Sequence, residues 1–159
     1  MIMKLTSSVF SNNGHIPSKY TCDAENVSPP LRIENAPVLA KSLVLIMDDP
    51  DIPDFVKEKF HIQVFDHWTS FNIDPKTSEI KEGHEPGVQG RNGAGKNGYT
   101  GPCPPDREHR YFFKLYALDK KLDLKEGATK ADVEAAMKGH VIEHCELIGR
   151  YERKKMVAV

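Results

Sequence analysis

Two aspartates and two histidines of this chain stand where loops meet predicted strands, and together they have the chemistry to bind a small anion. Asp49 and Asp51 follow the apolar run 43–47, while His67 and His109 each open a later extended segment. A carboxylate near a histidine favours the imidazolium form, because the charged ring then faces an opposite charge. Two such rings can donate charge-assisted hydrogen bonds to a phosphate while the aspartates orient them. We therefore expect Asp49, His67 and His109 to converge on one small surface cavity, with imidazolium donors holding the ligand.

A loop rich in glycine and proline precedes His109 and predicts a rigid wall beside these side chains. The segment 98–113 reads Gly-Tyr-Thr-Gly-Pro-Cys-Pro-Pro-Asp-Arg-Glu-His-Arg-Tyr-Phe-Phe. Prolines fix their own φ and bias the preceding residue toward extended geometry, while glycines allow a close backbone approach. Backbone N–H groups of such a loop are candidate donors to an anion, although Pro102 has none and its neighbours must supply them. Taken alone, the segment is equally typical of a hairpin connection with a surface histidine.

Five prolines surround the predicted cavity. They are Pro50, Pro53, Pro102, Pro104 and Pro105. Only about 5–6% of X-Pro bonds in folded proteins are cis, but the density of prolines around a rigid pocket raises that expectation. We predict at least one cis X-Pro bond among the five.

Short extended segments, each ended by turn-forming residues, make up most of the chain. Predicted strands span 5–10, 41–47, 67–73 and 109–118. The last of these is apolar on both faces, which is typical of a strand that lies centrally between packed layers. Many short strands with turns between them favour an antiparallel β-sandwich. At this length, residues 1–159 are expected to form a single domain.

A helix is predicted near the C-terminus. Thr129 is a good N-cap, Asp132 stands where a capping box places an acid, and Gly139 is positioned to end the helix. The following segment 140–151 also has apolar residues at helical spacing. We expect one or two peripheral helices in this part of the chain.

Five short motifs, spread over nearly the whole chain, stand in a family-like order. They are Asn-Val-Ser-Pro-Pro-Leu at 26–31, Asp-Asp-Pro-Asp at 48–51, Asp-His-Trp at 66–68, Gly-Pro-Cys-Pro-Pro at 101–105 before His-Arg-Tyr at 109–111, and Ala-Ala-Met-Lys-Gly-His at 135–140. This order resembles the phosphatidylethanolamine-binding protein (PEBP) family, most closely its prokaryotic, Raf-kinase-inhibitor-like branch. The resemblance implies a β-sandwich with peripheral helices, a small cavity at one end, and a final strand around 146–151 after a short helix.

The resemblance also implies which residues form the cavity and what it binds. The implied site consists of Asp49, Asp51, His67, Gly101, Pro102, His109 and Tyr111, and Cys103 in the same loop is a further candidate. The implied function is binding of phosphorylated head groups or other small anions, with a regulatory role. Inhibition of a protein kinase or a protease through loops around the pocket is the alternative that the family offers.

The segment 54–66 departs from the family pattern, because it is longer than in many prokaryotic relatives. Its charges indicate a surface excursion, while Phe55, Phe60 and Phe65 indicate partial burial.

Composition narrows the classes of partner. The chain has 22 basic and 23 acidic residues, so its net charge is −1 with neutral histidines. This balance argues against a general binder of nucleic acids or anionic membranes, which needs a basic face. Neither a membrane-spanning run nor a signal-peptide core is visible, so we expect a cytoplasmic protein without integral membrane association. The composition is compatible with either a monomer or a homodimer.

The state of the cysteines determines whether the chain has a nucleophile for an enzymatic function. Cys22, Cys103 and Cys145 fit no zinc or redox spacing. We expect thiols in a reducing compartment, with a Cys22–Cys103 disulfide as the minor alternative. A Cys103 thiol beside a histidine general base would permit a hydrolase, although no Gly-x-Ser-x-Gly elbow is present.

We expect no metal and no cofactor. A metal site could use His61, His67 and His109 with Asp49. However, these histidines lack the helical i, i+4 spacing of common metal sites, and the cysteines contribute nothing to them.

Overall fold

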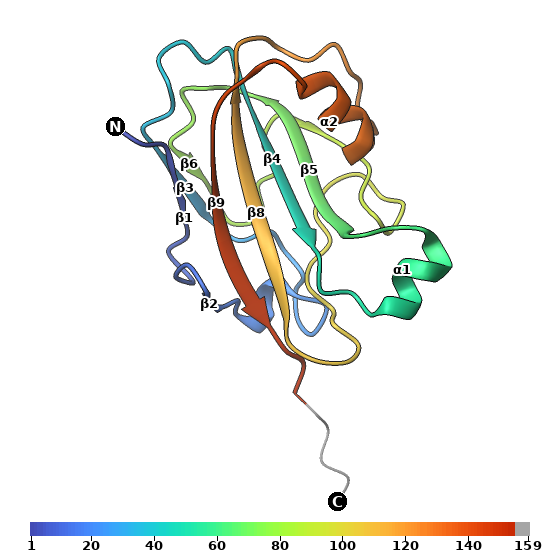
Figure 1. The fold of residues 1–159 in the computed structure, drawn as a ribbon. Coiled ribbons are helices and arrows are strands. Elements are labelled where there is room, and N and C mark those ends of the chain that lie inside the picture. The colour runs from blue at the N-terminus through green and yellow to red at the C-terminus, as the bar shows by residue number, and fades with distance from the viewer. Residues whose placement is uncertain (155–159) are drawn as a thin grey trace, which may run out of the picture.

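The computed structural model describes residues 1–154 and shows two packed β-sheets with two α-helices at their periphery (Figure 1). The larger sheet contains β2 (Gly14–His15), β4 (Ser42–Asp49), β5 (Phe65–Ile73), β7 (Val88–Gln89), β8 (His109–Leu118) and β9 (Val141–Tyr151), in the order β2-β9-β8-β4-β5-β7. The smaller sheet contains β1 (Lys4–Thr6), β3 (Leu31–Glu34) and β6 (Glu79–Ile80), in the order β1-β3-β6. All neighbouring strands are antiparallel except β2 and β9, which are parallel. The predicted mainly-β sandwich is confirmed.

Strand β4 is buried on both faces because it lies between two apolar layers. Leu43, Leu45 and Met47 point into the core between the sheets, whereas Val44 and Ile46 pack in a second cluster on the opposite face. That second cluster also contains residues of α2 (Lys130–Met137), which covers this face of the large sheet in Figure 1. The alternation follows from the two-residue period of a strand.

The strand prediction for 109–118 agrees with β8 at both ends, and the alternation of its faces is confirmed. The first strand is shorter than predicted, because β1 ends at Thr6. The Ser7 hydroxyl donates to the carbonyl of Pro30 and accepts from the N–H of Val9. The bond between Val9 and Ser7 is a local side-chain bond of the kind that competes with a strand ladder.

The helix prediction near the C-terminus is confirmed by α2. Both halves of the capping box are present, with the Asp132 N–H donating to Thr129 and the Thr129 N–H donating to Asp132. Gly139 follows with a positive φ of 82°, a conformation that glycine adopts without strain. The final strand that the resemblance implied around 146–151 is confirmed, and it begins earlier than expected, because the segment from Val141 onward pairs with β8 as β9. The helical alternative for 140–151 is wrong.

A helix in the middle of the chain was not anticipated. Helix α1 (Asp54–Phe60) ends at His61, whose φ of 54° is left-handed. Phe55 and Phe60 are 67% and 59% exposed, so the expected burial of these two rings is wrong. Phe65 is half-buried at the start of β5. The segment 54–66 is therefore the surface excursion that its charges predicted.

The prediction of a cis proline is wrong, since no cis peptide bond occurs in the described residues. Crowding of prolines does not change the intrinsic trans preference of each bond. Within residues 1–154, none of the helices has the length and apolar character needed to cross a membrane.

Candidate functional site

Three strand ends meet at one edge of the large sheet, and this places the predicted side chains together. Because β4 is antiparallel to both neighbours, its end lies beside the beginnings of β5 and β8. Asp48 is in register with Phe112 of β8 and Asp66 of β5. Asp49, His67 and His109 therefore line one cavity, as the sequence predicted.

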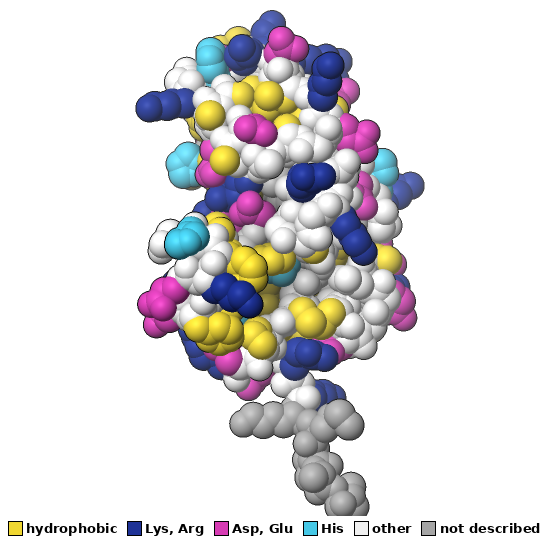
Figure 2. Space-filling view, turned by 90° about the vertical axis from the view of Figure 1, so that its right-hand side faces the viewer, with side chains coloured by type: hydrophobic (Ala, Val, Ile, Leu, Met, Phe, Trp, Pro, Cys, Tyr) yellow, Lys and Arg dark blue, Asp and Glu magenta, His cyan; other side chains and the backbone are white. Residues whose placement is uncertain are grey.

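The cavity is small and mostly apolar. Its volume is about 210 Å³, and the ionisable side chains that line it are Asp49, His67, His109 and Tyr111. Ile52, Pro53, Val56 and Phe65 form an apolar wall near α1. Figure 2 views the molecule from the α1 side, and apolar side chains gather over the lower part of this face. A ligand of a few heavy atoms with at least one polar group fits such a site.

His109 is held between two carboxylates. Its Nδ1 lies 2.6 Å from Oδ2 of Asp49, and its Nε2 lies 2.6 Å from Oδ1 of Asp106. A neutral imidazole has one N–H, so two carboxylate acceptors are the arrangement of an imidazolium ring. Burial raises the pKa of Asp49, although the hydrogen bond from His109 opposes this shift. Burial also acts to raise the pKa of Asp106, but the hydrogen bond and charge of His109, together with backbone N–H groups of the loop, outweigh burial and lower that pKa.

His67 is a neutral acceptor rather than the predicted imidazolium. Its Nδ1 lies 2.7 Å from the carbonyl oxygen of Thr100, and a carbonyl can only accept, so Nδ1 carries the proton. Burial lowers the pKa of His67 to about 4, against the opposing effect of the hydrogen bond to Thr100, and the nearby charge of His109 lowers it further. The lone pair of Nε2 is therefore the polar feature that His67 offers to a ligand. The expectation of two cationic donors is wrong for this residue.

Tyr111 lies between the two histidines, and its hydroxyl is unsatisfied. The ring makes an edge contact with His67 and a stacked contact with His109, with centroid distances of 5.2 and 6.4 Å. The side chain is fully buried, and within residues 1–154 the hydroxyl oxygen has no hydrogen-bonding partner. Such a group costs free energy unless something else in the cavity pairs with it.

The loop 100–105 closes one side of the cavity, and two of its N–H groups are already engaged within the protein. The N–H of Gly101 donates to Oδ1 of Asn26, and that of Thr100 donates to the carbonyl of His67. A Cβ on Gly101 would lie 2.3 Å from both Asn26 Oδ1 and the carbonyl oxygen of Tyr20, so only glycine fits. The Gly101 backbone anchors the loop instead of capturing an anion.

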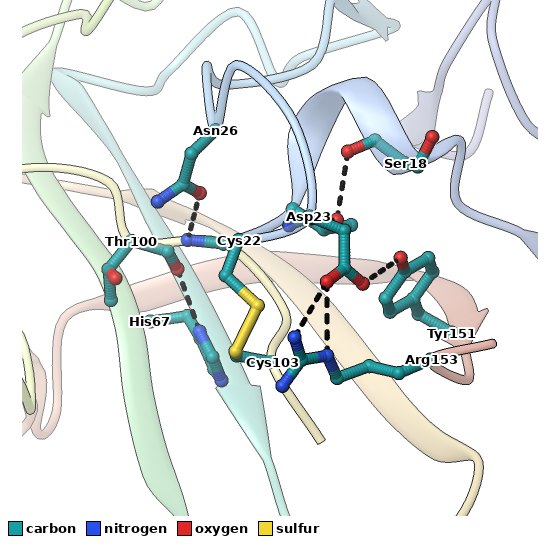
Figure 3. Close-up of a disulfide and its surroundings, with 11 residues drawn as sticks. Ser18, Cys22, Asp23, Asn26, His67, Thr100, Cys103, Tyr151 and Arg153 are labelled. Atoms are coloured by element: carbon teal, nitrogen blue, oxygen red, sulfur yellow. Dashed lines mark hydrogen bonds and ion pairs between the residues drawn. A yellow bond between two sulfur atoms is a disulfide. The ribbon is translucent and has the colours of Figure 1, made fainter. Parts of the chain in front are cut away.

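A disulfide joins this loop to the segment around Cys22, which corrects the expectation of free thiols (Figure 3). Cys22 and Cys103 have Cα atoms 5.5 Å apart and are 81 residues apart in sequence. The N–H of Cys22 donates to the carbonyl of Pro102, which brings the two loops into pairing distance. The bond lies at the cavity wall, because Cys103 lines the cavity.

Two of the predicted site residues do not line the cavity. The carboxylate of Asp51 pairs with Arg110 through two bonds of 2.8 and 2.9 Å, which lower the pKa of Asp51 to about 2 despite partial burial. Its backbone N–H donates to Oδ1 of Asp49 and so positions that carboxylate. Pro102 is buried in the loop and contributes its carbonyl to Cys22.

Asp106 is the residue that the sequence reasoning missed. It stands in the loop before β8, three residues ahead of His109, and its carboxylate reaches the ring from the solvent side. The spacing of an acid three residues before a histidine was visible in the sequence. The loop geometry that turns the two side chains together was not.

Comparison with known proteins shows to which family this fold belongs. The family model described as phosphatidylethanolamine-binding protein matches residues 6–152. A UPF0098 protein of Methanothermobacter thermautotrophicus is 50% identical, over 95% of this chain and 99% of its own length.

Two solved structures support the same relationship. A putative PEBP homologue of Chlamydia trachomatis is 47% identical with a TM-score of 0.91, covering 96% of this chain and 99% of that one. Escherichia coli YbcL, described as a member of the mammalian PEBP family, is 27% identical with a TM-score of 0.85, covering 97% and 100%. This chain belongs to the phosphatidylethanolamine-binding protein family.

Proposed function

We propose that the cavity binds a small phosphorylated ligand through the phosphate group. The observation that carries the proposal is the buried hydroxyl of Tyr111, which has no partner in the described residues although its ring lines the cavity. A phosphoryl oxygen accepts a hydrogen bond, and this would satisfy the tyrosine. The imidazolium of His109 supplies the opposite charge in the same cavity.

The neutral ring of His67 determines which protonation state of the phosphate the cavity prefers. Its Nε2 has only a lone pair, so it repels an unprotonated phosphate oxygen and accepts a bond from a P–OH group. A phosphomonoester loses its second proton near pH 6, so roughly half of it is the protonated monoanion at that pH. We therefore propose that the cavity binds the monoanion in preference to the dianion.

The role that we propose is binding, not hydrolysis. The hydrolase alternative depended on a thiolate of Cys103, and this sulfur is bonded to Cys22. A disulfide sulfur is not a nucleophile. The regulatory role that we propose follows from binding. A bound ligand would change the conformation of the loops around the cavity and so alter their contact with a protein kinase or a protease.

Isothermal titration calorimetry with O-phosphorylethanolamine tests the proposal. We expect binding to the wild-type protein, weakened about tenfold by Tyr111→Phe, because a charge-assisted hydrogen bond contributes roughly 1.5–3 kcal/mol. Tyr116→Phe is the matched control, since Tyr116 lies on the opposite face of the sheet. Absence of binding at millimolar ligand, or equal affinities in all three proteins, would contradict the proposal.

A further inference from the structure

We propose that Asp106 is an internal competitor of the ligand: its carboxylate holds the nitrogen of His109 that the phosphate must reach, and binding displaces it. The proposal rests on the function proposed above. It starts from the two contacts of the His109 ring, both of 2.6 Å, one to Asp49 and one to Asp106. With both nitrogens engaged, an anion can use His109 only by replacing one carboxylate.

The two carboxylates differ in how firmly they are held. The Asp49 side chain is 4% exposed and also accepts the N–H of Asp51 at 2.8 Å. The Asp106 side chain is 37% exposed and stands in a loop outside any strand or helix. A buried carboxylate cannot leave its cationic partner without a large desolvation penalty, whereas an exposed one is readily rehydrated. Asp106 is therefore the carboxylate that exchanges.

A second cation is in place to receive Asp106. The guanidinium of Arg107 has its Nε 3.7 Å from Oδ2 of Asp106, and its Nη2 donates to the carbonyl of Asp51 at 3.2 Å. Arg107 thus remains tethered to the neighbouring loop when the carboxylate turns away from His109. Asp106 exchanges one cationic partner for another, so its displacement does not leave an isolated charge.

The exchange of Asp106 for the ligand takes place where the cavity meets a neighbouring surface groove. Pro104 and Pro105 line both the cavity and a neighbouring surface groove, and Asp106 lines that groove. A carboxylate and a phosphate are both anionic acceptors for the same N–H, and two anions at one donor repel each other. Asp106 and the ligand therefore exclude each other at Nε2, and the carboxylate lowers the apparent affinity of the cavity.

The test is calorimetric titration of inorganic phosphate into the wild-type protein, Asp106→Asn and Glu108→Gln. The Asn variant keeps the size of the side chain and removes its charge. Glu108→Gln is the matched control, because it removes one negative charge from the same loop while Glu108 contacts Arg150 and His15 rather than His109. We expect Asp106→Asn to bind phosphate about tenfold more tightly, and Glu108→Gln to stay within about twofold of wild type.

The outcomes separate this proposal from the function on which it rests. If phosphate binds wild type, His109→Ala abolishes binding and Asp106→Asn shows no gain, the competitor proposal is wrong and the binding function stands. An equal gain in Asp106→Asn and Glu108→Gln would also overturn it, because loop charge alone would then explain the effect. If folded wild type and Asp106→Asn both fail to bind phosphate, the proposed function is wrong and the competitor proposal falls with it.

Discussion

His67 is bonded to Thr100 through its Nδ1, at 2.7 Å from the carbonyl oxygen, so the loop that carries the disulfide fixes the tautomer of a ring in the cavity. Figure 3 shows this bond beside the disulfide. The loop was predicted to be a source of anion donors. Through the carbonyl of Thr100 it also orients the acceptor nitrogen of His67.

Burial of His67 predicts a loss of stability in mild acid. Its pKa is lowered by burial to about 4 in the folded protein, while an unfolded chain binds the proton near pH 6.5. Between these values the unfolded state holds more protons, so stability is complete above about pH 6.5 and falls as the pH decreases toward 4.

The measurement is urea unfolding at about pH 7 and about pH 4.5, on wild type and His67→Gln. The lowered pKa of His67 corresponds to about 3 kcal/mol of stability at most. Between the two pH values, the free energy of unfolding of the wild type should therefore fall by roughly 2–3 kcal/mol more than that of the variant. An identical pH dependence in the two proteins would contradict the assignment of a neutral, buried ring.

Tyr111→Phe should stabilise the ligand-free protein while it weakens phosphate binding. An unpaired buried hydroxyl costs roughly 1–3 kcal/mol, and phenylalanine fills the same space without that cost. We expect the free energy of unfolding to rise by about 1 kcal/mol in phosphate-free buffer. Destabilisation by Tyr111→Phe would indicate that the hydroxyl already has a partner in the free protein.

Loss of the disulfide should destabilise the fold more than loss of the remaining thiol. Cys22 and Cys103 close a loop of 81 residues, and removing such a link typically costs about 2–4 kcal/mol. Cys22→Ser combined with Cys103→Ser should show this loss in urea unfolding. Cys145→Ser is the control and should change stability by about 0.5 kcal/mol or less, because Cys145 is unpaired and only half-buried. Equal losses in the two variants would contradict the structural role of the disulfide.

Local signals made much of the fold predictable. Thr129 and Asp132 begin α2 through a capping box that involves only neighbouring residues, and alternating apolar positions define β8 between His109 and Leu118. The convergence of Asp49, His67 and His109 was also predictable, because the end of one strand lies beside the beginning of its antiparallel neighbour.

Features that depend on distant parts of the chain were not predictable in the same way. The neutral state of His67 follows from burial and from a carbonyl 33 residues away. The pairing of Cys22 with Cys103 needs two loops to be held together by Asn26 and Pro102. Asp51 appeared equivalent to Asp49 in sequence, but Arg110 on β8 draws its carboxylate away from the cavity.

Comparison of phosphate with sulfate tests the central claim most directly. Both are tetrahedral oxyanions, but at about pH 5.5 phosphate retains P–OH groups and sulfate has no proton to donate. Calorimetric titration of each ion into the wild-type protein at this pH tests the bond to Nε2 of His67, because both ions offer acceptors to Tyr111 and His109 but only phosphate can donate a proton. The higher negative charge of sulfate favours sulfate at His109, so a preference for phosphate requires that donor. We predict that phosphate binds about tenfold or more tightly than sulfate at this pH, because phosphate can donate a proton to Nε2 of His67 and sulfate cannot. Equal affinity for the two ions at about pH 5.5 would contradict the account of a cavity that recognises a protonated phosphate.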